Sequence, residues 1–198
     1  WRLAGGAVAM LTLSQSHNLS AQLGPSWSSL DAGWAAVGRG SSWPRDKRTY
    51  GIRAFVRVTE VLHSLATGWH PHFHVILLLD RELQSHEMES LRASIAARFI
   101  RGVVSAGGGA GLEGQDLEPM ILGTEGILAH YCFKGTAGCF TDGVSRNPLA
   151  ILAHLWATGE GKPFWEEYTE NVLRRNRMQR SPSRGIDSVL ASGPAHYS

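Results

Sequence analysis

Three of the nine histidines stand at alternate positions, as His70, His72 and His74. Neutral imidazole is the commonest metal-binding side chain, so this row indicates a metal site. On an extended strand, neighbours in the row lie about 7 Å apart at Cα and the outer two about 13 Å. Because metal–nitrogen bonds are only about 2.0–2.1 Å long, an adjacent pair can converge on one ion, whereas all three would strain. We therefore expect two histidines and one ligand from another element.

The nearest acidic side chain on a neighbouring segment is Glu60. Its alternative interpretation is a solvated carboxylate at the end of a strand. Strict alternation places Glu60 with Ala54, Val56 and Val58, an apolar set that we expect to face away from the histidines. A bulge or local twist would then have to turn the carboxylate toward them.

The histidine row needs a strand to hold it. Residues 51–62 and 69–79 are rich in β-branched and apolar residues and flank a short connection, which predicts a β-hairpin. The residues between the histidines and beyond them, at positions 69, 71, 73, 75, 77 and 79, are all apolar. We expect this set to pack beneath helices, which leaves the histidines on the opposite, open face of the sheet.

The remaining segments predict an α+β fold. Before the hairpin come a strand at 7–14, an amphipathic helix at 19–37 interrupted near Pro25, and a loop at 38–50. After it come a helix at 83–103, a flexible glycine-rich loop at 106–114, a strand at 117–122, and helices at 125–134, 148–157 and 163–177. This order is that of a ferredoxin-like or palm-like fold, with an antiparallel sheet and helices packed on one face.

The composition favours one globular domain over residues 1–198. The chain is 43% hydrophobic with a net charge of +2, which excludes disorder as its main state. Its longest strictly apolar run, Val75 to Leu79, is far shorter than the roughly 20 residues of a membrane span, so we expect no membrane association. Two cysteines, Cys132 and Cys139, favour a reducing, intracellular setting. The chain begins at Trp1, and we expect the natural N-terminus to be missing.

Several motifs resemble those of one enzyme family in both type and order. The segment Trp69–Val75 resembles the His-hydrophobe-His motif of the HUH endonucleases, most closely the rolling-circle plasmid replication initiators of actinobacterial type. Residues 10–14 with His17 resemble their first motif, and residues 57–60 resemble the strand that enters the histidine hairpin. Residues 129–134 resemble their Tyr-x-x-Lys nucleophile motif, and residues 163–168 and 183–185 their closing segments. The ordered set covers most of the chain and is far more specific than Tyr-x-x-Lys alone.

The resemblance implies a metal-dependent nicking and strand-transfer enzyme. It implies a divalent ion, Mn²⁺ or Mg²⁺, held by His72, His74 and Glu60. It implies Tyr131 as the nucleophile, with Lys134 assisting at the scissile phosphate. Residues that would support the ligands or contact DNA are His70, Thr12, Arg57 and Glu125. The product would be a 5′-phosphotyrosine link and a free 3′-hydroxyl that primes synthesis at a plasmid origin.

General chemistry supports these roles. A tyrosine pKa near 10 leaves only about 0.1% phenolate at pH 7, so a divalent metal and a lysine are needed to offset charge at the phosphate. On a helix, Tyr131 and Lys134 share a face. His-rich ligation suits Mn²⁺ better than Mg²⁺. The implied partners are single-stranded or hairpin origin DNA, a host helicase and a DNA polymerase in the bacterial cytoplasm.

One position departs from the family pattern. Initiators of this type can use a glutamate about one turn before the tyrosine for termination, and here position 127 is Ile. The nearest acid, Glu125, is off the face of Tyr131. Two other interpretations stay open from the residues: a non-catalytic binder of single strands, and an unrelated His-x-His metallohydrolase.

The low net charge predicts that any DNA-binding surface is local. We expect it to be formed by Lys47, Arg48, Arg53, Arg57 and the arginine cluster from Arg174 to Arg184.

Overall fold

The computed structural model describes residues 1, 5–120, 145–174 and 180–192. The predicted helix at 125–134, which carries Tyr131 and Lys134, lies outside the described residues, as do both cysteines and Glu125. The described part is an α+β structure with an antiparallel sheet, as the sequence predicted. None of its helices is long and apolar enough to cross a membrane.

The sheet is built around the histidine hairpin. Its four longer strands run in the order β4-β1-β3-β2 and pair antiparallel, and two short strands pair with the outer edge of β2. The bounds are β1 Ala7–Leu13, β2 Ile52–Ser64, β3 Gly68–Leu79, β4 Gln115–Pro119, β5 Ser145–Arg146 and β6 Arg180–Pro182. Strand β3 therefore lies between β1 and β2, with hydrogen-bonded neighbours on both sides.

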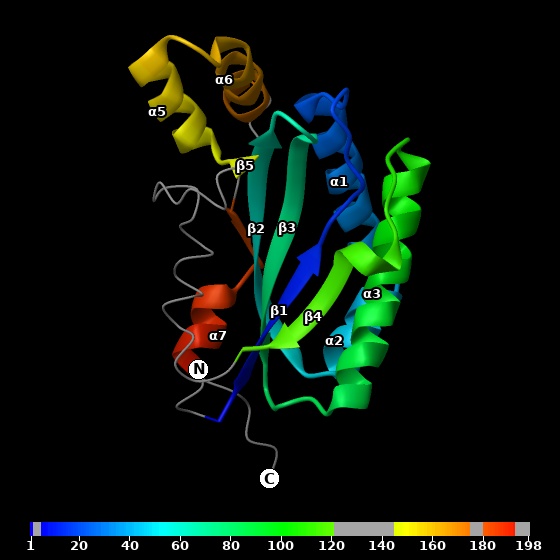
Figure 1. The fold of residues 1–198 in the computed structure, drawn as a ribbon. Helices are drawn as coiled ribbons and strands as arrows, with labels where there is room; N and C mark the ends of the chain where they lie inside the picture. Colours follow the sequence, from blue (N-terminus) through cyan, green and yellow to red (C-terminus); the bar gives the residue numbers. More distant parts are fainter. Residues whose placement is uncertain (2–4, 121–144, 175–179, 193–198) are drawn as a thin grey trace.

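Three helices cover one face of this sheet (Figure 1). These are α1 (Leu23–Gly38), α2 (Ser42–Thr49) and α3 (Ser85–Ser105). Beneath them lies a core of fully buried side chains that includes Leu11, Phe73, Leu77, Ile95 and Phe99. Phe73 and Leu77 belong to the apolar set of the hairpin, so the prediction that this set packs under helices is confirmed. Burying each such side chain contributes roughly 1.5–3 kcal/mol.

Helices α1 and α3 touch at a pair of glycines. A Cβ atom on Gly102 would lie 2.7 Å from the carbonyl oxygen of Ala32 and 2.8 Å from Cα of Gly33. Only glycine therefore fits at position 102, and its absence of a side chain sets the close approach of the two helices.

Two C-terminal helices, α5 (Pro148–Thr158) and α6 (Lys162–Thr169), pack with the π-helical turn Glu170–Arg174 at the hairpin end of the sheet (Figure 1). Helix α7 (Ile186–Ser192), which follows β6, lies toward the other end of β2 (Figure 1). Glu167 of α6 fixes this arrangement, because one carboxylate oxygen accepts a 2.6 Å hydrogen bond from the Leu23 amide and the other a 2.8 Å bond from the Trp69 indole. A second apolar cluster, which includes Trp27 and Ile151, surrounds these bonds.

Several predicted boundaries were wrong. The first helix starts at Leu23, so Pro25 falls in its first turn, where a missing amide costs nothing, and does not interrupt it. The predicted loop at 38–50 contains helix α2. The sequence of α2 is mostly polar, and its buried residue, Asp46, forms an ion pair with Arg98. The strand predicted at 117–122 is β4, which begins at Gln115 and ends at Pro119. The glycine-rich segment at 106–114 is fixed to the preceding part of the chain by a 2.7 Å hydrogen bond, which the Ser16 amide donates to the Gly109 carbonyl.

Candidate metal centre

The hairpin register places Glu60 directly opposite His72, and Val58 directly opposite His74. Directly opposed residues of an antiparallel pair project from the same face. Glu60 therefore points to the histidine side without any bulge, and the expectation that it faces away was wrong. The one irregularity of this pairing lies between Ile52 and Ala54, at the far end of the strand.

Three ligand atoms converge at this point. Glu60 Oε2 lies 2.9 Å from His72 Nε2 and 3.0 Å from His74 Nε2, and the two nitrogens are 3.1 Å apart. Three mutually adjacent ligands with bonds of about 2.1 Å to one ion would stand about 3 Å from each other, so the donor triangle fits a metal ion. Within the described ranges, no other three His, Cys, Asp or Glu side chains come together in this way.

The outer nitrogens of the two imidazoles are held by neighbouring groups. Nδ1 of His72 lies 3.4 Å from the carbonyl oxygen of His70, and Nδ1 of His74 lies 3.2 Å from the hydroxyl of Thr12. Because a carbonyl oxygen only accepts, we assign the hydrogen of neutral His72 to Nδ1, which leaves a lone pair on Nε2. That nitrogen can face a carboxylate at 2.9 Å only with a proton or a metal cation between them.

The carboxylate of Glu60 is ionised at neutral pH. Burial alone would raise its pKa, but hydrogen bonds and charge interactions with His72 and His74 together outweigh burial and hold the pKa well below its ordinary value. The centre thus combines one negative charge with two imidazoles. This is a suitable environment for a divalent cation.

The centre is buried. His72 and His74 are each 7% exposed, and Ile76 and Leu78 farther along the same row are 7% and 8% exposed. The predicted open face is therefore wrong at the metal centre. The sequence did indicate that this face is buried, because two large apolar residues, Ile76 and Leu78, follow the histidines on the same face.

His70 stands beside the donor triangle and not within it. Its Nε2 lies 2.8 Å from the hydroxyl of Ser14, and its ring stacks on His17 at 4.1 Å between centroids. Burial, followed by the proximity of His72 and His17, lowers the pKa of His70 to about 3, which keeps this ring neutral. Its position agrees with the expectation that only an adjacent pair can converge on one ion. The contact of Ser14 with His70 was not predicted from the sequence. A signal was present, because Thr12 and Ser14 are two residues apart on extended chain, so both hydroxyls project from the same face.

Arg57 is not brought to the centre. It lies on the helix-facing side of β2, where its guanidinium carbon is 4.4 Å from the centroid of Phe73 and 5.6 Å from that of Trp34. Its nearest carboxylate is Asp31, at 3.8 Å. Burial lowers the pKa of Arg57, partly opposed by Asp31. Arg57 therefore packs into the core and does not belong to a basic surface.

The other predicted basic residues lie in different parts of the molecule. Lys47 and Arg48 belong to α2 in the helical layer, whereas Arg180 of β6 stands opposite Val58. Because Val58 is on the histidine face, Arg180 shares that face with Glu60. Tyr131, Lys134 and Glu125 lie outside the described residues.

Comparison of the chain with protein-family models, with curated proteins and with solved structures gave no match. The centre is therefore defined by its donor set, two imidazole nitrogens and one carboxylate oxygen on one hairpin. Such a set can hold a divalent metal ion.

Proposed function

We propose that this chain is a metal-dependent endonuclease of the HUH type, which nicks single-stranded DNA and transfers the cut strand through a tyrosine. The observation that carries the proposal is the convergence of Glu60 Oε2, His72 Nε2 and His74 Nε2 within 3.1 Å of one another. These three side chains would hold the ion. When bound, the ion would supply Lewis-acid polarisation of the phosphate oxygens.

The topology supports this family assignment. Strand β3 inserts between β1 and β2, so that the β1-α1-β2 connection is a split β-α-β unit, as in a ferredoxin-like or palm-like fold. The metal ligands sit on an inner strand and its neighbour, where hydrogen bonds on both sides of β3 hold the backbone rigid. Thr12 of β1 and the His70 carbonyl of β3 then orient the two imidazoles.

The covalent step belongs to Tyr131. Its phenolic oxygen attacks phosphorus and loses its proton, the bond from phosphorus to the 3′ oxygen breaks, and that oxygen leaves as a 3′-hydroxyl. The product is a 5′-phosphotyrosine, which retains the bond for later strand transfer. Lys134, three residues after the tyrosine in the Tyr-x-x-Lys motif, adds positive charge at the phosphate. These two roles rest on the sequence motif.

The face around the centre also offers a cation for the DNA backbone. Arg180 is exposed and lies on the histidine face, opposite Val58. Guanidinium groups pair well with phosphate, so Arg180 is suited to hold the strand that enters the site. A plasmid rolling-circle origin, a helicase and a polymerase remain the biological setting that the sequence resemblance implies.

The test uses single-stranded oligonucleotides labelled at the 3′ end, incubated with the protein and Mn²⁺ and then run under denaturing conditions. We expect a labelled protein adduct, because the 5′-phosphate of the 3′ fragment is the linked end. The Tyr131→Phe variant serves as the matched control and should give no adduct. An adduct that survives this substitution would contradict the tyrosine mechanism. Metal-dependent cleavage without any adduct would instead favour the metallohydrolase interpretation, and binding without cleavage the non-catalytic one.

A further inference from the structure

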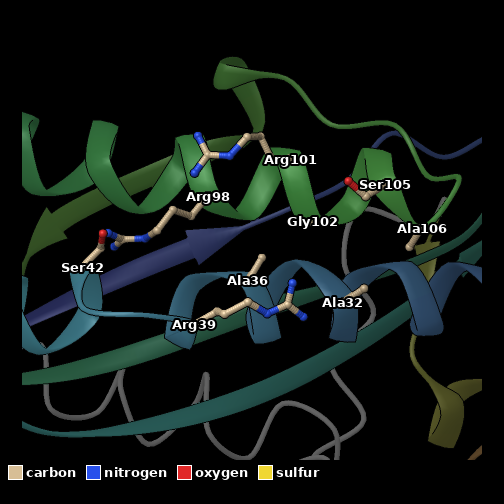
Figure 2. A pocket seen from close by; sticks show the side chains of 9 residues that line it. All are labelled: Ala32, Ala36, Arg39, Ser42, Arg98, Arg101, Gly102, Ser105 and Ala106. Atoms are coloured by element: carbon tan, nitrogen blue, oxygen red, sulfur yellow. The ribbon is translucent and has the colours of Figure 1, made fainter.

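A cleft of about 500 Å³ opens on the helical layer between α1, α3 and the start of α2 (Figure 2). Its floor is shallow because Ala32, Ala36 and Gly102 have little or no side chain there. The cleft lies on the side of the sheet that α1, α2 and α3 cover, whereas the metal centre is on the other. It is therefore a separate feature of the molecule.

Arginines from two helices surround the cleft. Arg39 follows the end of α1, and Arg98 and Arg101 are one turn apart on α3 (Figure 2). Arg39 and Arg101 are exposed and form no ion pair within the described part of the chain. Since only Arg98 has a carboxylate partner, Asp46, the cleft carries two uncompensated positive charges.

Arg98, the third arginine of the cleft, is held by neighbouring groups. Its side chain is 7% exposed and its terminal nitrogens bind Asp46 and Ser94, but its Nε has no hydrogen-bond partner in the described structure.

The start of α2 lies at one end of the cleft. Ser42 is the first residue of this eight-residue helix and lines the cleft, and the preceding Ser41 makes no side-chain cap. No acidic residue lies in the first turn, so the positive end of the helix dipole is not offset there. The positive end of this helix dipole and the guanidinium groups of the arginines together suit an anion with several oxygen acceptors.

We propose that this cleft binds phosphate groups of a nucleic-acid backbone. Among the residues that line it there is neither an aromatic side chain to stack on a base nor a carboxylate to bind a ribose, so a free nucleotide fits poorly. Positive charge also continues beyond the cleft along α2, at the exposed Arg45 and Arg48, as a polymer of phosphates would require. The bound segment of nucleic acid is a different one from that at the metal centre. The inference does not depend on the nicking activity.

The test measures binding of a fluorescent short DNA duplex by anisotropy, in EDTA so that the metal centre plays no part, over a series of salt concentrations. The variant R39Q/R101Q removes two exposed charges from the cleft. We expect its dissociation constant to rise about tenfold and its log–log salt slope to fall by about 1.8, since each phosphate contact contributes about 0.9. S105E, which adds a carboxylate at an exposed position of the cleft, should weaken binding in the same direction.

The matched control is R81Q/R92Q, which changes the net charge equally but removes arginines already neutralised by Glu87 and Glu89. It should leave the affinity and the salt slope nearly unchanged. Equal binding by R39Q/R101Q and the wild-type protein would overturn the proposal. A titration with inorganic phosphate separates the sources: an effect of R39Q/R101Q on phosphate binding but not on DNA binding would assign the cleft to a small anion and would also overturn it.

Discussion

Glu60 and His72 stand directly opposite each other on the two strands of one hairpin, with Oε2 and Nε2 2.9 Å apart. This relationship explains why the donor set needs no loop and no irregular backbone. His74, two residues along the strand, brings its Nε2 to the same carboxylate oxygen at 3.0 Å. A two-stranded element held on both sides by the sheet thus prepositions all three ligands.

The support of His74 by Thr12 gives the first prediction. Replacing Thr12 by Val removes the hydroxyl that holds Nδ1 of His74 while preserving side-chain shape. Loss of such an outer contact costs about 10–100-fold in metal affinity, and we expect a drop in this range. The Thr12→Ser variant keeps the hydroxyl and should bind nearly as well as the wild-type protein. Isothermal titration calorimetry with Mn²⁺ measures the affinity of the wild-type protein and of both variants. Equal affinities of Thr12→Val and the wild-type protein would show that the contact is not needed.

The buried ion pair of Asp46 and Arg98 gives the second prediction. Both side chains are less than 10% exposed, so removing one partner leaves a charge in the interior. Asp46→Leu and Arg98→Met are each expected to lower the free energy of unfolding by about 3–5 kcal/mol. The double variant should lose less than either single one, because it leaves no unpaired charge. Urea unfolding of the wild-type protein, the two single variants and the double variant gives a double-mutant cycle. Losses of stability that add up in the double variant would contradict this interpretation.

The helix contact at Gly102 gives the third prediction. Gly102→Ala should lower the free energy of unfolding by about 1–3 kcal/mol, because the added Cβ would meet the backbone of α1 at 2.7 Å. Gly38, in α1, has open space around its Cα and a helical backbone, so Gly38→Ala should cause no loss. Comparable losses in the two variants, measured by thermal or urea unfolding, would mean that close approach is not the cause.

The buried ring of His63 gives the fourth prediction. Its ring lies against Phe164, at 4.0 Å between centroids and tilted by 35°, and against Trp69. Burial lowers the pKa of His63 below the ordinary 6.5, and this shift is partly opposed by Glu167. The unfolded chain then takes up the proton first as the pH falls. Stability contributed by the neutral ring is present above about pH 6.5 and is lost below it, toward the lower pKa of the folded state.

Replacing His63 by Phe keeps an aromatic ring against Phe164 and Trp69 and removes the titratable group. Urea unfolding in EDTA between neutral and mildly acidic pH should therefore show a flatter stability curve for His63→Phe than for the wild-type protein. The exposed His86 supplies the control, since His86→Ala should leave the curve as it is. A wild-type curve that matches His63→Phe over this range would refute the prediction.

The sequence was sufficient for the hairpin, the apolar face and the choice of two histidines, because a period of two is visible in residues 69–79. It was insufficient for the side on which Glu60 lies. That depends on the pairing register, which sets Val58 against His74 and cannot be read from either strand alone. The inward turn of Arg57 follows from the same register. The helix at 42–49 was missed since its one buried residue, Asp46, is charged and produces no apolar pattern.

The central claim is that Glu60, His72 and His74 hold one divalent ion. Its most direct test is calorimetric titration of the EDTA-stripped protein with Mn²⁺, alongside His72→Ala/His74→Ala and a control in which the remote His86 and His154 are replaced by Ala. We predict one ion per chain for the wild-type and control proteins and no binding by His72→Ala/His74→Ala, with the fold retained by circular dichroism. Undiminished binding by His72→Ala/His74→Ala, or no binding by the wild-type protein, would contradict the account.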